Sequence, residues 1–329
     1  MRISVIGDGG WGTCLAILLQ NKGHSVTLWG VFPSYVAYLK RKRINTRFLP
    51  GVRIPRSLEI TDDLNRAIES KELIILAVPS QFMRQILRRI KRIAIPRKIL
   101  FLSVTKGLET QTLFRMSQVI KDELGIVKLA VLSGPTIAYE VARHIPTTAV
   151  VACRSKKTRS FIARLFNTER FRIYTNSDVV GVELGGSLKN IIAIACGISD
   201  GLGFGTNAKA ALLSRGLAEI SRLGINMGAK ATTFSGISGL GDLVTTCISP
   251  FSRNRYVGEE IGRGRKLRQI IRRMKMVAEG IPTTKAAHRL ALKYKVDMPI
   301  TREVYQVLYK NKNSQKAVRD LMLRSLKEE

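Results

Sequence analysis

The sequence predicts an α/β fold in which a Rossmann-like, doubly wound and mostly parallel sheet is followed by an all-helical C-terminal domain. Short apolar runs rich in β-branched residues alternate with helical stretches over the first half of the chain, and a glycine-rich segment follows the first run. Such alternation indicates a parallel sheet with right-handed crossovers. After about residue 178 the strand signals stop. We therefore expect two domains, residues 1–178 and residues 179–329.

The composition is that of a globular protein with room for two domains. The chain has 329 residues, of which 45% are hydrophobic and 24% charged. The apolar start is interrupted by glycines without a small-residue cleavage site, and no apolar run reaches the roughly 18 residues that span a membrane, so we expect a cytoplasmic protein. Four widely separated cysteines and three histidines argue against zinc, and we predict no metal site.

The net charge of +31 is the unusual feature of the composition. It is compatible with nucleic-acid binding, with attraction of anionic substrates, or with a generally basic proteome. The lysines and arginines are spread over several helices, without an aromatic-interleaved platform or a single basic tail. We therefore expect no specific nucleic-acid partner. A basic nucleic-acid-binding protein that keeps the α/β domain as a scaffold is the alternative from a different class.

The glycine-rich segment predicts a dinucleotide site. Residues 2–6 form the first predicted strand, and Gly7-Asp-Gly9-Gly-Trp-Gly12 leads from it into a helical stretch. G-x-G-x-x-G in this context is the dinucleotide-binding fingerprint. Gly7 permits the tight turn, Gly9 lets the backbone approach a pyrophosphate, and Gly12 allows close packing of helix on strand. Amides at the helix start then face the phosphates. The predicted cofactor is NAD or NADP.

The end of the second predicted strand, residues 25–29, does not decide between the two cofactors. An acidic residue there commonly holds the ribose of NAD, and a nearby arginine accepts the 2′-phosphate of NADP. This chain instead has Gly30, Val31 and Phe32. The basic cluster Lys40–Arg43 could reach a 2′-phosphate, but a solvated helix face explains it equally well.

The remaining strands of the first domain place three loops at the ligand-binding edge, because ligands bind beyond the carboxyl ends of such sheets. These loops contain Pro79-Ser80, Thr105–Gly107 and Ser133–Thr136. Lys106 offers a cation suited to a phosphate or carboxylate, although an ordinary surface lysine fits the sequence as well. Strands are predicted at 73–78, 99–104, 129–132, 148–152 and 171–174, with helices at 13–20, 81–93, 110–124 and 156–166.

The second domain begins with an unusually placed lysine. Lys189 follows Gly185-Gly186 and precedes an apolar run that ends at Cys196. The glycines leave room for a bulky group beside the amine, and desolvation would lower its pKa towards the range of an acid or base. A lysine that extends to solvent from the edge of a buried helix is the simpler interpretation. Helices are predicted at 179–198, 208–223, 239–246, 255–262, 283–294, 301–309 and 314–326, and 201–205 is interpreted as a turn.

Three further stretches offer polar groups. Asp242 ends a glycine-rich turn, Ser252-Arg253-Asn254-Arg255 combines groups that suit a phosphate, and Glu279 precedes a glycine. Asp242 has a structural alternative as a helix cap, and the Ser252–Arg255 stretch has one as a polar helix start. The Glu279 carboxylate could bond an amide or a ribose.

As an ordered set, these motifs resemble the bacterial-type NAD(P)-dependent glycerol-3-phosphate dehydrogenases. The resemblance covers almost the whole chain, and its stretches are Val5–Thr13, Arg47–Gly51, Ala77–Ser80, Thr105–Glu109, Ser133–Thr136, Gly185–Asn190, Gly201–Asn207, Gly239–Asp242, Ser252–Asn254 and Glu279-Gly280.

The resemblance implies reversible hydride transfer between NAD(P)H and dihydroxyacetone phosphate, which gives glycerol 3-phosphate for phospholipid synthesis. It implies that Lys189 is the proton donor and acceptor, and that the protein is a homodimer. The implied substrate-binding residues are Lys106, Gly134, Thr136, Lys189, Asp242, Ser252, Arg253 and Asn254. The implied cofactor-binding residues are Gly7, Gly9, Gly10, Trp11, Gly12, Lys106, Ala138, Arg253, Val277 and Glu279.

Three positions depart from the pattern of these dehydrogenases. Val31 stands where a charged or polar residue is frequent, Gly10 replaces a usual serine, and His144 replaces a frequent glycine. The nearest alternative is a related two-domain dehydrogenase acting on another hydroxy acid or hydroxyacyl substrate. The polar cluster from Ser252 to Asn254 argues against it, because that cluster suits a phosphate.

Overall fold

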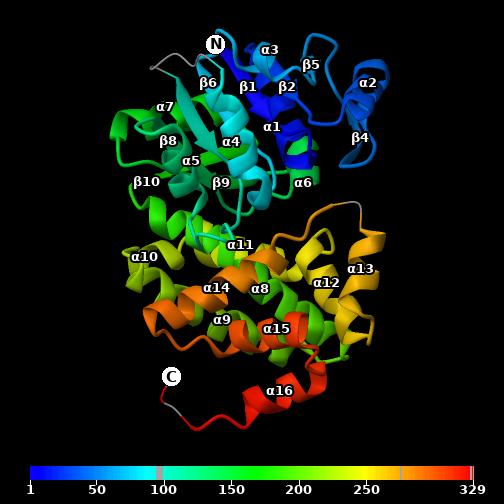
Figure 1. Cartoon of the computed structure of the whole chain (residues 1–329), viewed down its shortest axis with the longest axis vertical. Helices are drawn as coiled ribbons and strands as arrows, with labels where there is room; N and C mark the ends of the chain where they lie inside the picture. The colour runs from blue at the N-terminus through cyan, green and yellow to red at the C-terminus, as the bar shows by residue number, and fades with distance from the viewer. Residues whose placement is uncertain (94–98, 275, 327, 329) are drawn as a thin grey trace. The chain divides into compact units, whose positions relative to one another are not determined.

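An eight-stranded sheet dominates the first half of the chain in the computed structural model, which describes residues 1–93, 99–274, 276–326 and 328 (Figure 1). The strand order is β10-β9-β8-β7-β6-β1-β2-β5. The strands are β1 (Arg2–Ile6), β2 (Ser25–Trp29), β5 (Glu59–Thr61), β6 (Leu73–Leu76), β7 (Leu100–Ser103), β8 (Lys128–Ser133), β9 (Thr147–Ala152) and β10 (Phe171–Asn176). A separate antiparallel pair is formed by β3 (Ile44–Asn45) and β4 (Leu49–Arg53).

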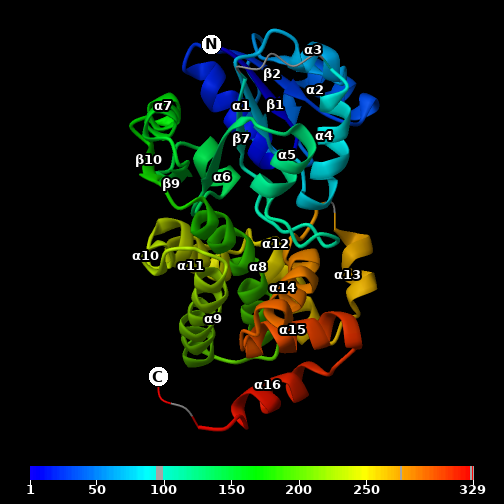
Figure 2. The ribbon, with the colours of Figure 1, turned by 60° about the vertical axis from the view of Figure 1, so that its left-hand side comes forward.

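The predicted mostly parallel, doubly wound sheet is confirmed. Ile3 and Val5 face one apolar cluster and Ile6 faces the other, as the two-residue period of a strand requires. Helices cover both faces of the sheet (Figure 2). The first cluster includes α1 (Gly10–Asn21), α2 (Pro33–Lys42), α6 (Ala138–Ala142) and α7 (Lys156–Phe166), and the second includes α3 (Leu64–Ile68), α4 (Met83–Lys91) and α5 (Met116–Leu124). Among the described strands of this eight-stranded sheet, the one antiparallel pairing is β8 with β9, which α6 connects.

The end of α6 explains the departure at His144. This residue has a φ of 58°, and its N–H bonds to the carbonyl of Val141, while the N–H of Ile145 bonds to the carbonyl of Glu140. These two bonds form the helix-ending motif that glycine usually occupies, because glycine adopts a positive φ without strain. His144 therefore terminates a helix, and a glycine there in relatives would serve the same backbone conformation.

The chain folds into two compact units. Unit 1 comprises Met1–Lys106 and Phe114–Glu183, and unit 2 comprises Gly107–Leu113 and Leu184–Glu329. Unit 2 is helical, apart from turns. Its elements are the main part of α8 (Val179–Gly201), α9 (Thr206–Asn226), α10 (Ala231–Phe234), a π-helical turn (Ile237–Gly241), α11 (Asp242–Ile248), α12 (Arg253–Gly262), α13 (Leu267–Arg273), α14 (Gly280–Tyr294), α15 (Pro299–Lys310) and α16 (Ser314–Met322).

Helix α8 combines length with an apolar composition more than any other helix in the described part of the chain. By length and hydropathy it could cross a membrane, but 89% of its most apolar window is buried inside the protein, as in a core helix. Glycines on α8 and α12 let the two backbones touch: a Cβ at Gly197 would lie 2.0 Å from the carbonyl oxygen of Arg255, and one at Gly258 would lie 2.0 Å from that of Ile194. No other residue fits these positions without moving a helix.

The N-terminal part of α8 is fixed by a buried carboxylate. Glu183 pairs with Arg115 and accepts hydrogen bonds from the backbone N–H of Ser117 at 2.7 Å and from its hydroxyl at 2.6 Å. Removing one partner of such a buried pair typically costs about 3–5 kcal/mol, so this contact holds the start of the helix that carries Lys189.

A second buried carboxylate holds the start of α15. Glu219, on α9, accepts hydrogen bonds from the N–H groups of Ile300, at 2.5 Å, and Thr301, at 3.1 Å, and from the Thr301 hydroxyl at 3.1 Å. Burial raises the pKa of this carboxyl from 4.5 to about 7, although these hydrogen bonds favour its ionised form. Since the carboxyl titrates higher in the folded protein than in the unfolded chain, its neutral form stabilises the fold.

We expect Glu219→Gln to flatten the pH dependence of stability. The contribution of Glu219 is fully present below pH 4.5 and is lost as the pH rises through 7. Over that interval the free energy of unfolding of the wild type should fall by about 3 kcal/mol relative to the variant. Chemical denaturation at several pH values measures the difference. Parallel curves for the two proteins would contradict the expectation.

Candidate functional site

The glycine-rich loop has the geometry that a dinucleotide requires. Gly7 has a φ of 121°, and a Cβ on it would lie 2.8 Å from the backbone of Ala77. A Cβ on Gly12 would lie 2.0 Å from the carbonyl oxygen of Gly7, so α1 begins directly against the loop. A Cβ on Gly9 would meet nothing within 4 Å. The loop thus keeps one open side at the N-terminus of a 12-residue helix, where backbone amides favour phosphate.

Neighbouring residues of unit 1 hold this loop in place. A Cβ on Gly10 would lie 2.5 Å from the carbonyl oxygen of Phe48, which gives a steric reason for glycine where serine is usual. Ala138, the first residue of α6, lies next to Gly10. The indole of Trp11 packs edge-on against Phe171 with ring centroids 6.3 Å apart. The predicted cofactor residues of unit 1, other than Lys106, therefore surround one loop.

Lys106, Gly134 and Thr136 come together as the sequence suggested. The Nζ of Lys106 donates to the carbonyl of Gly134 at 2.7 Å and to the hydroxyl of Thr136 at 3.3 Å. That hydroxyl also lies 3.1 Å from the Gly134 carbonyl, to which it donates. The three residues follow β7 and β8, at the carboxyl ends of the strands, where ligands of such sheets bind. This cluster offers an anion a cation and a hydroxyl.

Lys189 lies inside unit 2 and is 5% exposed. Its Nζ pairs with the carboxylate of Asp242 and donates to the hydroxyl of Thr246 at 2.6 Å. Asp242 is 1% exposed, so the pair is desolvated. A buried lysine whose charge is paired with a carboxylate is suited to proton transfer and to stabilising a developing oxyanion. The interpretation of Lys189 as a lysine extending to solvent is wrong.

Lys189 meets Asp242 because α8 runs alongside the π-helical turn and α11 and in the same direction as they do. A Cβ on Gly185 would lie 2.6 Å from the carbonyl oxygen of Ser238, and Lys189 reaches Asp242 one turn later on both segments. Farther along, Cys196 hydrogen-bonds with Cys247, and this bond together with burial raises the pKa of the Cys247 thiol. The thiol therefore stays neutral and adds no negative charge near Lys189.

A second group of polar contacts links the residue after Lys189 to α12 and α14. The side chain of Asn254 donates to Asn190 at 2.9 Å and accepts from the N–H of Gly280 at 2.9 Å. A Cβ on Gly280 would lie 2.7 Å from the carbonyl oxygen of Asn190, so glycine is required there. Asn254 is 8% exposed, and each end of its amide makes one hydrogen bond inside the protein. The second N–H of its NH2 group takes no part in these two bonds.

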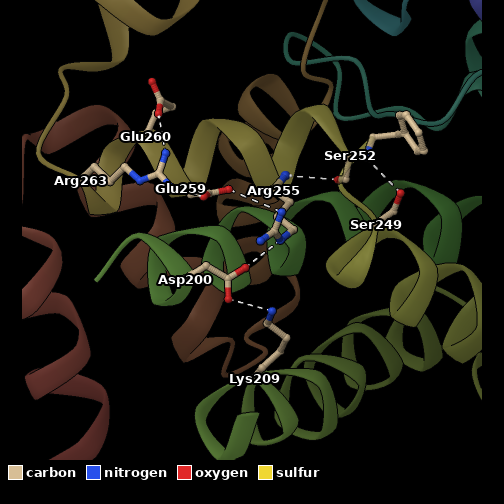
Figure 3. Close-up of polar contacts among 9 residues, drawn as sticks. Asp200, Lys209, Ser249, Ser252, Arg255, Glu259, Glu260 and Arg263 are labelled. Atoms are coloured by element: carbon tan, nitrogen blue, oxygen red, sulfur yellow. Dashed lines mark hydrogen bonds and ion pairs between the residues drawn. The ribbon is translucent and has the colours of Figure 1, made fainter. Parts of the chain in front are cut away.

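The two arginines of the Ser252–Arg255 stretch differ in their surroundings. Ser252 caps α12 by accepting from the N–H of Arg255. The exposed Arg253 donates to the carbonyl of Val277 at 2.8 Å. Arg255 instead turns to Asp200, which accepts from its Nε at 2.7 Å and pairs with Lys209 at 2.8 Å (Figure 3).

Arg253 is therefore the arginine available for a ligand, whereas Arg255 takes part in an internal ion-pair network. That network continues along α12 through Glu259 and Arg263 (Figure 3). Glu279, which precedes α14, interacts electrostatically with Arg253. Four of the predicted residues, Ser252, Arg253, Val277 and Glu279, thus lie around the start of α12.

Two polar residues of this region, Thr246 and Asn190, were not predicted from the sequence. Thr246 contacts Lys189 and lies one helical turn after Asp242, a spacing that could have indicated it. Asn190 binds Asn254, and only its position next to Lys189 pointed to it. Within the described ranges, no cluster of three or more His, Cys, Asp or Glu side chains could hold a metal ion. The cysteines are free and buried.

Two family models match most of the chain. The N-terminal model of NAD-dependent glycerol-3-phosphate dehydrogenase matches residues 2–159, and the C-terminal model matches residues 178–319. Among curated proteins, glycerol-3-phosphate dehydrogenase [NAD(P)+] of Chlorobium phaeobacteroides (strain BS1) is 49% identical and that of Pelodictyon phaeoclathratiforme is 50% identical, each covering 100% of this chain and 99% of the relative.

Solved structures give the same result. The crystal structure of glycerol-3-phosphate dehydrogenase from Coxiella burnetii has a TM-score of 0.95 and 39% identity, covering 98% of this chain and 99% of that one. The enzyme from Saccharomyces cerevisiae has a TM-score of 0.83 and 27% identity, with 98% and 99% of the two chains covered. The similarity extends over both units.

Proposed function

Because the chain belongs to the NAD-dependent glycerol-3-phosphate dehydrogenase family, we propose that Lys189 is the proton donor and acceptor of the family's reaction in this protein. The protein is an oxidoreductase that acts on the CH–OH group of glycerol 3-phosphate and uses NAD or NADP. The observation that carries the proposal is the desolvated Lys189, whose Nζ lies between Asp242 and Thr246.

The proposed role of Lys189 follows from the charge that develops on the substrate oxygen during the reaction. When dihydroxyacetone phosphate is reduced, negative charge develops on the ketone oxygen, and an ammonium group stabilises that charge and supplies the proton. In the oxidative direction the neutral amine takes a proton from the C2 hydroxyl. Asp242 keeps the ammonium oriented, and the Thr246 hydroxyl fixes the position of Nζ. The bound nicotinamide supplies or accepts the hydride.

We propose that Arg253 binds the phosphate of the substrate, together with Ser252 and Asn254. The position of Arg253, an exposed residue at the start of a ten-residue helix, supports this role, because arginine and helix N-termini both favour phosphate. The same role is proposed for Lys106, Gly134 and Thr136, which form a cationic cluster at the ends of β7 and β8. We also propose that Asp242 and Lys189 contact the substrate. With these two, the proposed set of substrate-binding residues is complete.

We expect Arg253→Ala to raise the KM for dihydroxyacetone phosphate about 10- to 100-fold, with kcat within about threefold. The phosphate contact is equally strong in the ground state and the transition state, so its loss weakens binding without slowing the chemical step. Steady-state kinetics measures both constants. Arg263→Ala, at the other end of the same helix, is the control. A large fall in kcat with unchanged KM would place Arg253 at the reacting centre instead.

For the cofactor we propose the glycine-rich loop, with Gly7, Gly9, Gly10, Trp11, Gly12 and Ala138, and additional contacts from Lys106, Arg253, Val277 and Glu279. The open side at Gly9 and the amides of α1 support pyrophosphate binding by the loop. The fixed indole of Trp11 keeps the loop in one conformation.

The substrate assignment is tested by NADH and NADPH oxidation with dihydroxyacetone phosphate, compared with unphosphorylated dihydroxyacetone. We expect turnover with the phosphorylated ketone, and a much lower kcat/KM without the phosphate. Equal turnover of both ketones would contradict phosphate recognition.

We further propose that the protein supplies glycerol 3-phosphate for phospholipid synthesis and that it is cytoplasmic. We also propose that it forms a homodimer. Light scattering would measure the mass of the particle in solution and so test the dimer.

A further inference from the structure

The carboxyl end of β2 is where a dinucleotide-binding fold usually carries the acidic residue for the adenosine ribose. In this chain β2 ends at Trp29, and the residues that follow are Gly30, Val31 and Phe32. None of these three is charged. The side chains of Val31 and Phe32 are 44% and 60% exposed, so this strand end presents apolar surface. It suits a flat adenine ring, but offers no hydrogen-bond acceptor of its own for a ribose hydroxyl.

A carboxylate nevertheless lies at this strand end, supplied by the glycine-rich loop. A Cβ built on Gly30 would lie 2.5 Å from Oδ2 of Asp8 and 2.8 Å from its Cγ. The carboxyl group of Asp8 therefore occupies the space that a side chain at position 30 would fill. Glycine at 30 and aspartate at 8 are complementary, because any larger residue at 30 would displace the carboxyl group.

The backbone of Asp8 is held by hydrogen bonds, but one oxygen of its carboxyl group, Oδ2, accepts none from the described residues. Its backbone carbonyl accepts from Asn45 at 2.8 Å and from the Thr13 hydroxyl at 3.2 Å. The residue is 8% exposed, and within the described part of the chain no donor reaches Oδ2. Buried polar atoms are nearly always hydrogen-bonded, so an unpartnered carboxylate oxygen beside a ligand-binding loop requires a donor from outside the chain.

The charges around Asp8 do not supply that donor. Burial raises the pKa of the Asp8 carboxyl. A hydrogen bond from its own backbone N–H and the positive charge of Arg47 act in the opposite direction and lower this pKa. The Arg47 guanidinium lies over the ring of Phe48, 5.2 Å from its centroid. Arg43, at the end of α2, donates to the carbonyls of Pro55 and Leu58 at 3.3 and 2.7 Å.

We propose that Asp8 accepts a hydrogen bond from the adenosine ribose hydroxyls and thereby makes this protein selective for NAD over NADP. The proposal rests on the dinucleotide-binding role of unit 1. A 2′-hydroxyl donates to a carboxylate, whereas the 2′-phosphate of NADP has no proton to donate and carries the same sign of charge. The acidic residue thus comes from the loop after β1 rather than from the end of β2.

The test is the equilibrium binding of NADH and NADPH to the full chain, followed by tryptophan fluorescence, without substrate or turnover. We expect the wild type to bind NADH at least about 30-fold more tightly than NADPH. Asp8→Asn keeps the shape but loses the charge, and should weaken NADH binding about tenfold and bring the ratio of the two Kd values below about three. Glu69→Gln, an exposed acid-to-amide change in the same unit, should leave the ratio unchanged.

A gain-of-function variant keeps the test decisive if Asp8→Asn alone folds poorly. Asp8→Asn combined with Val31→Arg places a guanidinium at the strand end, and should bind NADPH more tightly than NADH. The proposal is overturned if the wild type binds NADPH as tightly as NADH, or if the ratio of Kd values is the same with and without Asp8. Binding of neither dinucleotide to the wild type would overturn the cofactor role of unit 1 and this proposal with it.

Discussion

Lys189→Met is expected to lower kcat about 1,000-fold or more while NADH and NADPH bind with unchanged Kd. The methionine keeps much of the volume of the lysine side chain but removes the proton and the positive charge. General acid catalysis typically contributes about 10²–10⁴-fold, and stabilisation of a developing oxyanion contributes about as much. Both are removed from the same atom, so the losses overlap rather than multiply.

The measurement combines steady-state reduction of dihydroxyacetone phosphate with dinucleotide binding followed by fluorescence. Lys209→Met is the matched control, because Lys209 lies in the same unit and also pairs with a carboxylate, that of Asp200 (Figure 3). Asp200 keeps Arg255 as a partner in that variant. Near-normal turnover in Lys189→Met would exclude Lys189 as the acid–base group, and a parallel loss of dinucleotide binding would point to general damage.

Local sequence patterns predicted the elements with strong periodicity. The ranges 2–6, 25–29 and 156–166 coincide with β1, β2 and α7, because each is a short run rich in apolar and β-branched residues or a helix with a clear apolar face. Helix α2 and the β3–β4 pair were not predicted. Helix α2 buries only Val36 and Leu39 among its described residues, so its hydrophobic pattern is too weak to detect.

Element ends that depend on tertiary contacts were less predictable. A helix was expected over 110–124, but α5 begins at Met116, since residues 107–113 group with unit 2. The last helix was expected to reach residue 326, but α16 ends at Met322. Leu323 and Leu326 are 70% and 101% exposed and have no core to pack against.

Some residues of the candidate site are likewise indicated by a local sequence pattern, whereas others depend on tertiary contacts. The spacing of Gly7, Gly9 and Gly12 is itself the signal of the loop, so the sequence alone indicated it. The contact of Lys189 with Asp242 joins residues 53 positions apart, and it depends on the parallel register of α8 and α11. No local pattern contains that register, and the assignment of Asp242 came from the family resemblance. The steric reason for Gly30 is likewise visible only once Asp8 is placed against it.

Asp242→Asn is expected to lower kcat/KM about 100-fold at neutral pH and to shift the pH profile. The amide keeps the shape of the carboxyl group but removes the charge that faces the Lys189 ammonium in a desolvated site. Loss of an opposite charge within hydrogen-bond distance disfavours the charged form, so the pKa of Lys189 should fall.

The direction of the shift distinguishes this electrostatic role from a merely structural one. In the reductive direction the ammonium is the active form, so activity of the variant should be lost at a lower pH than in the wild type. In the oxidative direction the neutral amine is active, so activity should already rise at a lower pH. Both profiles move the same way because they report one group. Thr246→Val, which removes a neutral hydrogen bond from the same Nζ, should lower the rate with a smaller shift. If Asp242→Asn loses activity equally at every pH, Asp242 acts by holding α8 against α11, and the charge on Lys189 is set elsewhere.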